Sequence, residues 1–131
     1  LKLDDTIFQF ADSGKPFVGI CLGLQLLFDS SDEFGANSGL GLVKGKVKKF
    51  KFHSSNSIKY PVPQIGWNMI KQTNGSWNDT LLCNNDNGDF MYFVHSYYVE
   101  PQKKNIIVSS TTYGNTSQAR TGNKSKKCRL I

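Results

Sequence analysis

A glycine–x–cysteine–x–glycine segment, Gly19 to Gly23 with Cys21 at its centre, constrains the chain more than any other feature. It follows a short apolar run, Phe17–Ile20, that suits a buried strand, and precedes a leucine-rich stretch, Leu22–Phe28, that suits a buried helix. A sharp turn from strand to helix has the form of a nucleophile elbow, with sulfur in place of oxygen. Such a turn strains its central residue, and the flanking glycines avoid side-chain collisions. The order of these elements predicts an α/β domain with a parallel sheet.

The same turn suggests a chemical role for Cys21. A helix that begins beside the cysteine directs its N-terminal dipole at the sulfur, which favours thiolate over thiol. The amide N–H of Leu22 would then point to where an oxyanion forms. The alternative is an inert cysteine in a tight turn, because cysteine is often buried and the motif should arise by chance in roughly one chain of this length in a hundred. The residues alone leave both interpretations open.

Hydrophobic spacing predicts the other elements. Apolar residues at helical spacing predict a helix over residues 3–12, followed by the stop signals glycine and proline. Residues 53–68 contain two prolines and a Gly-Trp pair, which indicates a shaped loop, and the Asn- and Gly-rich residues 74–89 indicate an exposed connection. Aromatic and β-branched residues predict strands at 45–52, 90–99 and 106–113.

The positive charge of the chain is concentrated at one end. The formal net charge is +6, but residues 1–117 hold 11 lysines, no arginine and 10 acidic residues, and residues 118–131 carry the other five positive charges. The last 14 residues also lack hydrophobic periodicity until the final two. We therefore expect a domain over 1–117 and a basic, disordered or aberrant tail over 118–131.

The cysteines exclude two classes of protein. Cys21, Cys83 and Cys128 are odd in number and far apart, with no CxxC and no paired histidines. This pattern predicts neither a disulfide framework nor a zinc site, and a reducing cytoplasm is the default compartment. The longest apolar run, Phe17–Phe28, is shorter than the roughly 20 residues that span a bilayer, and no signal peptide is recognisable.

The segment "KPFVGICLGLQLLF", residues 15–28, resembles the nucleophile segment of class I (triad-type) glutamine amidotransferases. Three further segments, 39–50, 62–68 ("VPQIGWN") and 92–99 ("YFVHSYYV"), resemble the glutaminase subunits of imidazole glycerol phosphate synthases, in the same order. The resemblance covers about Leu3 to Ser117. It implies an α/β, flavodoxin-like fold with a central, mostly parallel sheet, here incomplete.

The resemblance also implies roles for individual residues. Cys21 would attack the side-chain amide of glutamine, forming a thioester and releasing ammonia, and the Leu22 N–H would donate to the oxyanion. Glutamine would be held by Gln25, Ser96 and Tyr97. No metal and no cofactor is implied.

The partner implied by the resemblance is a (β/α)₈-barrel cyclase that uses the ammonia, and Trp67 and Asn68 would lie in the surface facing it. Structural interpretations stand beside these roles: Gln25 as a partly exposed helical residue, Trp67 as a core aromatic, and Ser96 and Tyr97 as the end of a strand. Gln64 stands where relatives often carry histidine.

The catalytic histidine and glutamate of the family come from an F-H-P-E segment, which these 131 residues do not contain. The two histidines, His53 and His95, are not followed by Pro-Glu, and His95 matches the F-V-H-S-Y strand rather than the base. The glycine-rich loop that precedes the elbow in the family is also absent. We expect a fragment whose sequence departs from the family near Ser117–Gln118 and whose glutaminase turnover is negligible.

Three alternatives remain at the level of sequence. A paralogous amidotransferase of bacterial surface-sugar synthesis would share these motifs. A nucleic-acid-binding module could use the Lys46–Lys51 strand, Phe50, Phe52 and the basic tail, although the rings and Lys49 and Lys51 alternate to opposite faces. A non-catalytic interaction protein could retain only the surface around Trp67.

Overall fold

The computed structural model describes residues 3–52, 60–114, 116–121 and 128–130; beyond Thr116 only the backbone is described. In chain order the elements are α1 (Leu3–Asp12), β1 (Phe17–Gly19), α2 (Leu22–Leu26), β2 (Phe28–Ser31), β3 (Asn37–Ser38), β4 (Val43–Lys49), β5 (Gln64–Met69), β6 (Lys71–Gln72), β7 (Phe90–His95), β8 (Tyr97–Pro101), the 3₁₀ helix η1 (Lys104–Ile106), β9 (Ile107–Tyr113), β10 (Thr116–Thr121) and β11 (Cys128–Leu130). None of the helices in the described ranges has the length and apolar character needed to cross a membrane.

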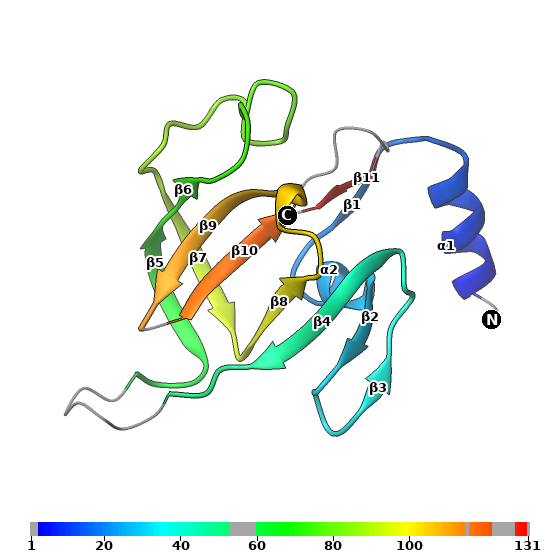
Figure 1. Cartoon of the computed structure of the whole chain (residues 1–131), viewed down its shortest axis with the longest axis horizontal. Helices are drawn as coiled ribbons and strands as arrows, with labels where there is room; N and C mark the ends of the chain where they lie inside the picture. The colour runs from blue at the N-terminus through cyan, green and yellow to red at the C-terminus, as the bar shows by residue number, and fades with distance from the viewer. Residues whose placement is uncertain (1–2, 53–59, 115, 122–127, 131) are drawn as a thin grey trace.

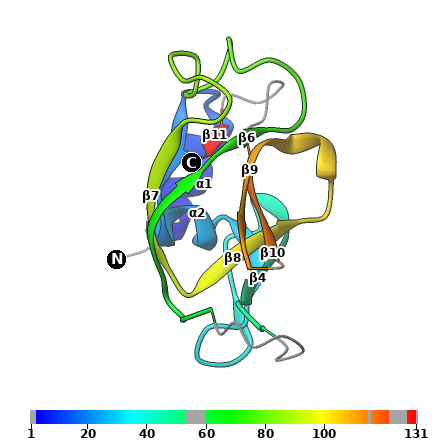
Figure 2. The ribbon, with the colours of Figure 1, turned by 90° about the vertical axis from the view of Figure 1, so that its left-hand side faces the viewer.

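The strands form four small sheets, with the orders β1-β11, β10-β9-β6, β3-β2-β4-β8 and β5-β7. Helix α2 packs against β1 and β2, while α1 lies at the far end of the body from β5 (Figure 1). Seen from the side, β9 and β10 form a ladder that stands across the body from β7 (Figure 2). The predicted α/β class is confirmed.

Parallel pairing is less extensive than the elbow motif suggests. Only β1–β11 and β2–β4 are parallel among the described strands, and the other five ladders are antiparallel. The physical reason lies in the connections, because parallel neighbours need a crossover of a dozen or more residues, usually helical. The turn after Tyr113 is too short for a crossover, so β10 returns antiparallel to β9.

Two hydrophobic clusters fill the interior. The first cluster lies between α2 and the β2–β4–β8 sheet, and its buried members are Leu24, Leu27, Phe28, Val47 and Val99. The second lies around β7 and β9, and its buried members are Ile70, Trp77, Leu82, Phe93 and Val108. Each such side chain contributes about 1.5–3 kcal/mol by leaving water.

A third group of rings, which we call the aromatic clasp, consists of Phe50, Phe52, Tyr60 and Tyr113. Phe50 stacks on Phe52 at 5.7 Å, and Phe52 lies 5.4 Å from Tyr60 and 5.6 Å from Tyr113 between ring centroids. The Tyr113 hydroxyl donates to the Pro61 carbonyl at 2.9 Å. The clasp therefore joins the two residues that flank 53–59 to the end of β9.

Helix α2 is shorter than predicted. It ends at Leu26, and Phe28 already begins β2, so the prediction of a helix through Phe28 is wrong. Carbonyls that would extend the helix instead accept bonds from the chain that follows: the Leu27 carbonyl from Val43 N–H at 2.8 Å, and the Phe28 carbonyl from Gly41 N–H at 3.0 Å. Tertiary pairing wins over local helix propensity here.

Three other predictions need correction. Residues 53–68 are not all loop, because β5 begins at Gln64 and pairs along its whole length with β7. The predicted strand 90–99 is two strands interrupted at Ser96. The connection 74–89 is not wholly exposed, because Trp77 and Leu82 are buried in the second cluster and the Trp77 indole donates to the Val108 carbonyl at 2.8 Å. In each case the structure of the segment depends on a partner distant in sequence, which local patterns do not reveal.

Helix α1 over Leu3–Asp12 and strand β9 over Ile107–Tyr113 confirm the predictions for those segments. The expected boundary between Ser117 and Gln118 falls inside β10, which pairs antiparallel with β9. The division of the chain at that point stays a prediction. His53 lies outside the described residues.

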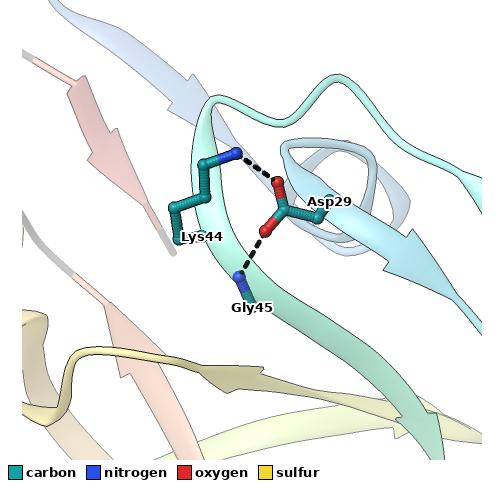
Figure 3. Close-up of polar contacts among 3 residues, drawn as sticks. All are labelled: Asp29, Lys44 and Gly45. Atoms are coloured by element: carbon teal, nitrogen blue, oxygen red, sulfur yellow. Dashed lines mark hydrogen bonds and ion pairs between the residues drawn. The ribbon is translucent and has the colours of Figure 1, made fainter.

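Asp29 fixes the start of β4 against β2. Its carboxylate accepts from Lys44 Nζ at 2.7 Å and from the Gly45 N–H at 2.9 Å (Figure 3). The bond to Lys44 is the main cause that lowers the pKa of the Asp29 carboxyl below its ordinary value. The carboxylate thereby links β2 to β4.

Candidate active site

The elbow has the strained backbone that its sequence predicts. Cys21 stands directly before α2 with φ 53° and ψ −116°, a conformation that costs an ordinary residue about 1–3 kcal/mol and is often found at functional sites. The turn is closed by the Gly23 N–H, which donates to the Ile20 carbonyl at 2.9 Å. The Cys21 side chain is exposed. The turn thus presents a thiol to the outside of the fold.

The two flanking glycines differ in their steric role. A Cβ on Gly19 would lie 2.7 Å from the Gly23 carbonyl oxygen, so a larger residue does not fit there. A Cβ on Gly23 would meet no atom within 4 Å. The prediction that both glycines avoid collisions is therefore correct for Gly19 and wrong for Gly23, whose backbone is the surface that Gly19 approaches.

Leu22 is the first residue of α2, and the first N–H groups of a helix have no acceptor within it. The role of the Leu22 amide at an oxyanion stays a prediction. Helix α2 has only five residues, so its dipole contributes less than a long helix would.

Residues from the elbow and from the β7–β8 junction meet at one carbonyl. Gln25 Nε2 donates to the Tyr97 carbonyl at 3.3 Å, and His95 Nδ1 lies 2.7 Å from the same oxygen. The neighbouring Ser96 carbonyl accepts from the Phe50 N–H at 3.1 Å, which ties the junction to the end of β4. The structure therefore brings together the three residues predicted to hold glutamine, Gln25, Ser96 and Tyr97, although they are about 70 positions apart.

A cavity of about 350 Å³ lies between α2 and the loop that joins β2 to β3. Its polar lining includes Gln25, Glu33 and Asn37, and Phe34, which is 99% exposed with φ 53°, stands at its rim. The loop is held by its own bonds, among them Asn37 Nδ2 to the Glu33 carbonyl at 2.6 Å. Glu33 was not predicted from the sequence, because its position beside Gln25 depends on the path of this loop.

The outer face of the β5–β7 hairpin is apolar and exposed. Three cross-strand pairs point outward, and each residue is between 42% and 67% exposed: Ile65 with Val94, Trp67 with Tyr92, and Met69 with Phe90. We call these six residues the hairpin face. The Trp67 and Tyr92 rings pack edge to face at 5.6 Å. Contiguous apolar surface of this kind is typical of interaction sites.

Trp67 and Asn68 point to opposite sides of β5. Trp67 is 67% exposed in the hairpin face, so its core interpretation is wrong. The Asn68 side chain turns inward, where its Oδ1 accepts from Gln64 Nε2 at 2.8 Å, and Gln64 is fully buried. The role of Asn68 in a partner surface stays a prediction.

Among the described residues, the rings near β4 do not form an exposed platform for nucleic acid. Phe50 is only 4% exposed, and its ring is covered by Phe52, Tyr98 and Tyr113. On the outer side of β4, Lys48 forms an ion pair with Glu100 at 2.6 Å. The Phe50 ring is therefore not open for a base to stack on it, and Lys48 is already paired with a carboxylate.

Comparison with known proteins supports the resemblance that the elbow motif carries. A family model described as "Glutamine amidotransferase class-I" matches residues 3–128. Three relatives bear the name "Imidazole glycerol phosphate synthase subunit HisH". The relative from Bacillus subtilis is 42% identical over 113 residues, which cover 86% of this chain and 51% of the relative. The relative from Helicobacter hepaticus is 43% identical over 112 residues, which cover 86% of this chain and 49% of the relative. The relative from Aquifex aeolicus is 41% identical over 114 residues, which cover 87% of this chain and 51% of the relative.

The chain spans about half the length of the curated relatives it matches. Residues 3–128, which the family model matches, include the elbow, the Gln25–Tyr97 contact, the hairpin face and every site residue predicted from sequence. This chain belongs to the class I glutamine amidotransferase family.

Proposed function

We propose that the protein supplies the nucleophile and glutamine-binding half of a glutaminase that delivers ammonia to an imidazole glycerol phosphate synthase, in the pathway of histidine biosynthesis. The observation that carries this proposal is the strained, exposed Cys21 one helical turn from Gln25, whose side chain reaches Tyr97. No observation favours the surface-sugar paralogue or a purely non-catalytic module.

The chemistry follows from the elbow. The Cys21 thiolate attacks Cδ of the glutamine side chain, and the amide oxygen becomes an oxyanion to which the Leu22 N–H donates. Collapse of the tetrahedral intermediate breaks the C–N bond, and the leaving nitrogen takes a proton from a water molecule to depart as ammonia. The hydroxide that remains hydrolyses the γ-glutamyl thioester to glutamate and regenerates the thiolate.

The cavity beside α2 suits the other end of the substrate. Glutamine carries an α-ammonium and an α-carboxylate, and the Glu33 carboxylate in the cavity wall complements the ammonium. Gln25 offers an amide at the same wall, and its side chain is held by the Tyr97 carbonyl. The volume of about 350 Å³ is large enough for one amino acid.

The hairpin face would bind the partner subunit, for which we propose the (β/α)₈-barrel cyclase. Its outward aromatic pair, Trp67 and Tyr92, is of the kind that forms the centre of stable interfaces. We place the complex in the cytoplasm, where the free thiols Cys21 and Cys83 would remain reduced.

Thiol alkylation tests the substrate site. Cys21 and Cys83 are both exposed and free, so one sample contains the reporter and its internal control. We expect glutamine to slow iodoacetamide modification of Cys21, measured by peptide mass spectrometry, without changing the rate at Cys83. Asparagine, one methylene shorter, should protect less. Equal modification of Cys21 with and without glutamine would rule out the substrate site.

Turnover is a separate matter. The 131 residues contain no F-H-P-E segment, so we expect glutaminase turnover by this segment alone to be negligible. Release of ammonia at the rate of a complete amidotransferase would show that another residue serves as the base.

A further inference from the structure

The Tyr97 carbonyl connects the elbow to the β7–β8 junction, and it is contacted by His95, a residue that has no assigned role above. The Tyr97 carbonyl accepts one bond from the elbow, from Gln25 Nε2 at 3.3 Å, and lies 2.7 Å from His95 Nδ1. A carbonyl oxygen has two lone pairs and can serve both donors. Because a carbonyl cannot donate, the nitrogen of His95 that faces it must carry the proton for this bond to form.

The direction of this carbonyl is set by the junction between β7 and β8. In the β4–β8 ladder Lys49 lies opposite Tyr97, and the bond to β4 is made by the preceding carbonyl, that of Ser96, to the Phe50 N–H. Successive carbonyls along an extended strand point to opposite sides. The Tyr97 carbonyl therefore turns away from β4 and toward α2, where the short bond to His95 holds it.

His95 is itself anchored in the interior. It is half-buried, pairs with the fully buried Gln64 across the β5–β7 ladder, and its ring lies 5.4 Å from Phe50 and 5.8 Å from Phe93 between centroids. The imidazole thus joins a fixed part of the sheet to the one carbonyl that Gln25 uses.

We propose that His95 is a positioning residue for the glutamine site: its Nδ1–H orients the Tyr97 carbonyl, which in turn fixes the Gln25 amide one turn after Cys21. Gln25 also lines the cavity, and with Nε2 committed to Tyr97 its Oε1 remains as an acceptor for an N–H of the substrate. His95 touches neither the thiol nor the substrate in this scheme. The inference rests on the proposed function for its substrate, but the link from His95 to Gln25 does not.

Two variants separate positioning from packing. His95→Asn keeps an N–H donor near the position of Nδ1 but loses most of the ring contact. His95→Leu keeps apolar contact with Phe50 and Phe93 but loses the donor. Positioning predicts that Asn rescues and Leu does not, whereas a packing role predicts the reverse order.

The first readout is protection of Cys21 by glutamine, with Cys83 as the internal control. We expect the half-protective glutamine concentration to rise about fivefold to tenfold in His95→Leu, the loss of one well-placed hydrogen bond, and to stay within about twofold of the unsubstituted chain in His95→Asn. A Leu variant that is protected as well as the unsubstituted chain, or an Asn variant as weak as Leu, would overturn the proposal.

The second readout needs no ligand, and its first part needs no variant. Nitrogen-15 NMR of the unsubstituted chain should show neutral His95 as the Nδ1–H tautomer; the Nε2–H tautomer would overturn the proposal outright. The Gln25 side-chain NH₂ signals, assigned by their loss in Gln25→Leu, should be resolved in the unsubstituted chain and in His95→Asn. They should shift toward the values of free glutamine side chains in His95→Leu. If glutamine fails to protect Cys21 in the unsubstituted chain, the proposed function falls while these NMR results still decide the role of His95.

Discussion

Two antiparallel ladders of the molecule share an architecture and differ in their outer faces. In β4–β8 the outward residues of β4 are Lys44, Lys46 and Lys48, and Lys48 pairs with Glu100 on β8. In β5–β7 every outward position of the hairpin face is apolar. Antiparallel sheets commonly have one buried and one solvated face. The charged outer face of β4–β8 is therefore suited to contact with water. The β5–β7 ladder leaves an apolar surface that favours association with protein.

The largest effect should come from truncating a phenylalanine in each of the two sheets. Phe28, in the strand β2 that pairs with β4, is fully buried, and Phe90 is 58% exposed in the hairpin face. We expect Phe28→Ala to lower the free energy of unfolding by about 3–5 kcal/mol, measured by urea denaturation. Phe90→Ala should change it by about 0.5 kcal/mol or less. Similar losses would mean that the hairpin face is covered within the monomer.

A matched pair of glycines gives the next effect. Gly45 in β4 has φ +145° and Gly66 in β5 has φ +144°, so alanine is strained at both. A Cβ at Gly45 would also lie 2.4 Å from the Glu100 carbonyl oxygen, whereas at Gly66 it would meet nothing within 4 Å. We expect Gly45→Ala to cost about 1–3 kcal/mol more than Gly66→Ala. Equal costs would show that β8 can move away from β4.

The hairpin face itself should matter for binding more than for folding. Trp67→Lys with Tyr92→Lys removes one edge-to-face pair, which contributes about 0.5–1.5 kcal/mol to stability. The double variant should aggregate less in light scattering and bind the cyclase that we propose as partner at least about 30-fold more weakly in calorimetric titration, as expected for residues at an interface centre. Lys46→Ala on the outer face of β4 serves as the control and should bind unchanged.

The smallest effect concerns the ion pair on the solvated ladder. The hydrogen bond from Lys48 is the main cause that lowers the pKa of Glu100 below its ordinary value of 4.5. The folded-state pKa is depressed, so the stabilisation is present above the unfolded-state pKa and disappears as the pH falls through the folded-state value. Glu100→Gln should therefore flatten the decline of stability on the acid side of pH 4.5, measured by urea unfolding from pH 6 downward. An unchanged acid profile would show that the pair contributes nothing measurable.

The comparison also shows what sequence can predict. The elbow, α1 and β9 follow local rules of spacing and glycine placement, so their positions were predicted. The end of α2, the strand β5 and the buried Trp77 depend on partners tens of residues away, which local rules do not contain. The same holds in the site: Cys21 and Gln25 were found from one motif, whereas Glu33 and His95 acquire their places only when separate segments meet.

The aromatic clasp has a consequence for how this protein can diverge. Phe52 and Tyr60 are held together by ring contacts and both pack on Tyr113, so the ends of the intervening segment are fixed by the body of the fold. Closing a longer loop between fixed ends adds little entropic cost, about 0.6 kcal/mol for each doubling of length. Residues 53–59 are therefore a position where evolution, or an engineer inserting a tag, can change length and composition while leaving the elbow and the hairpin face intact.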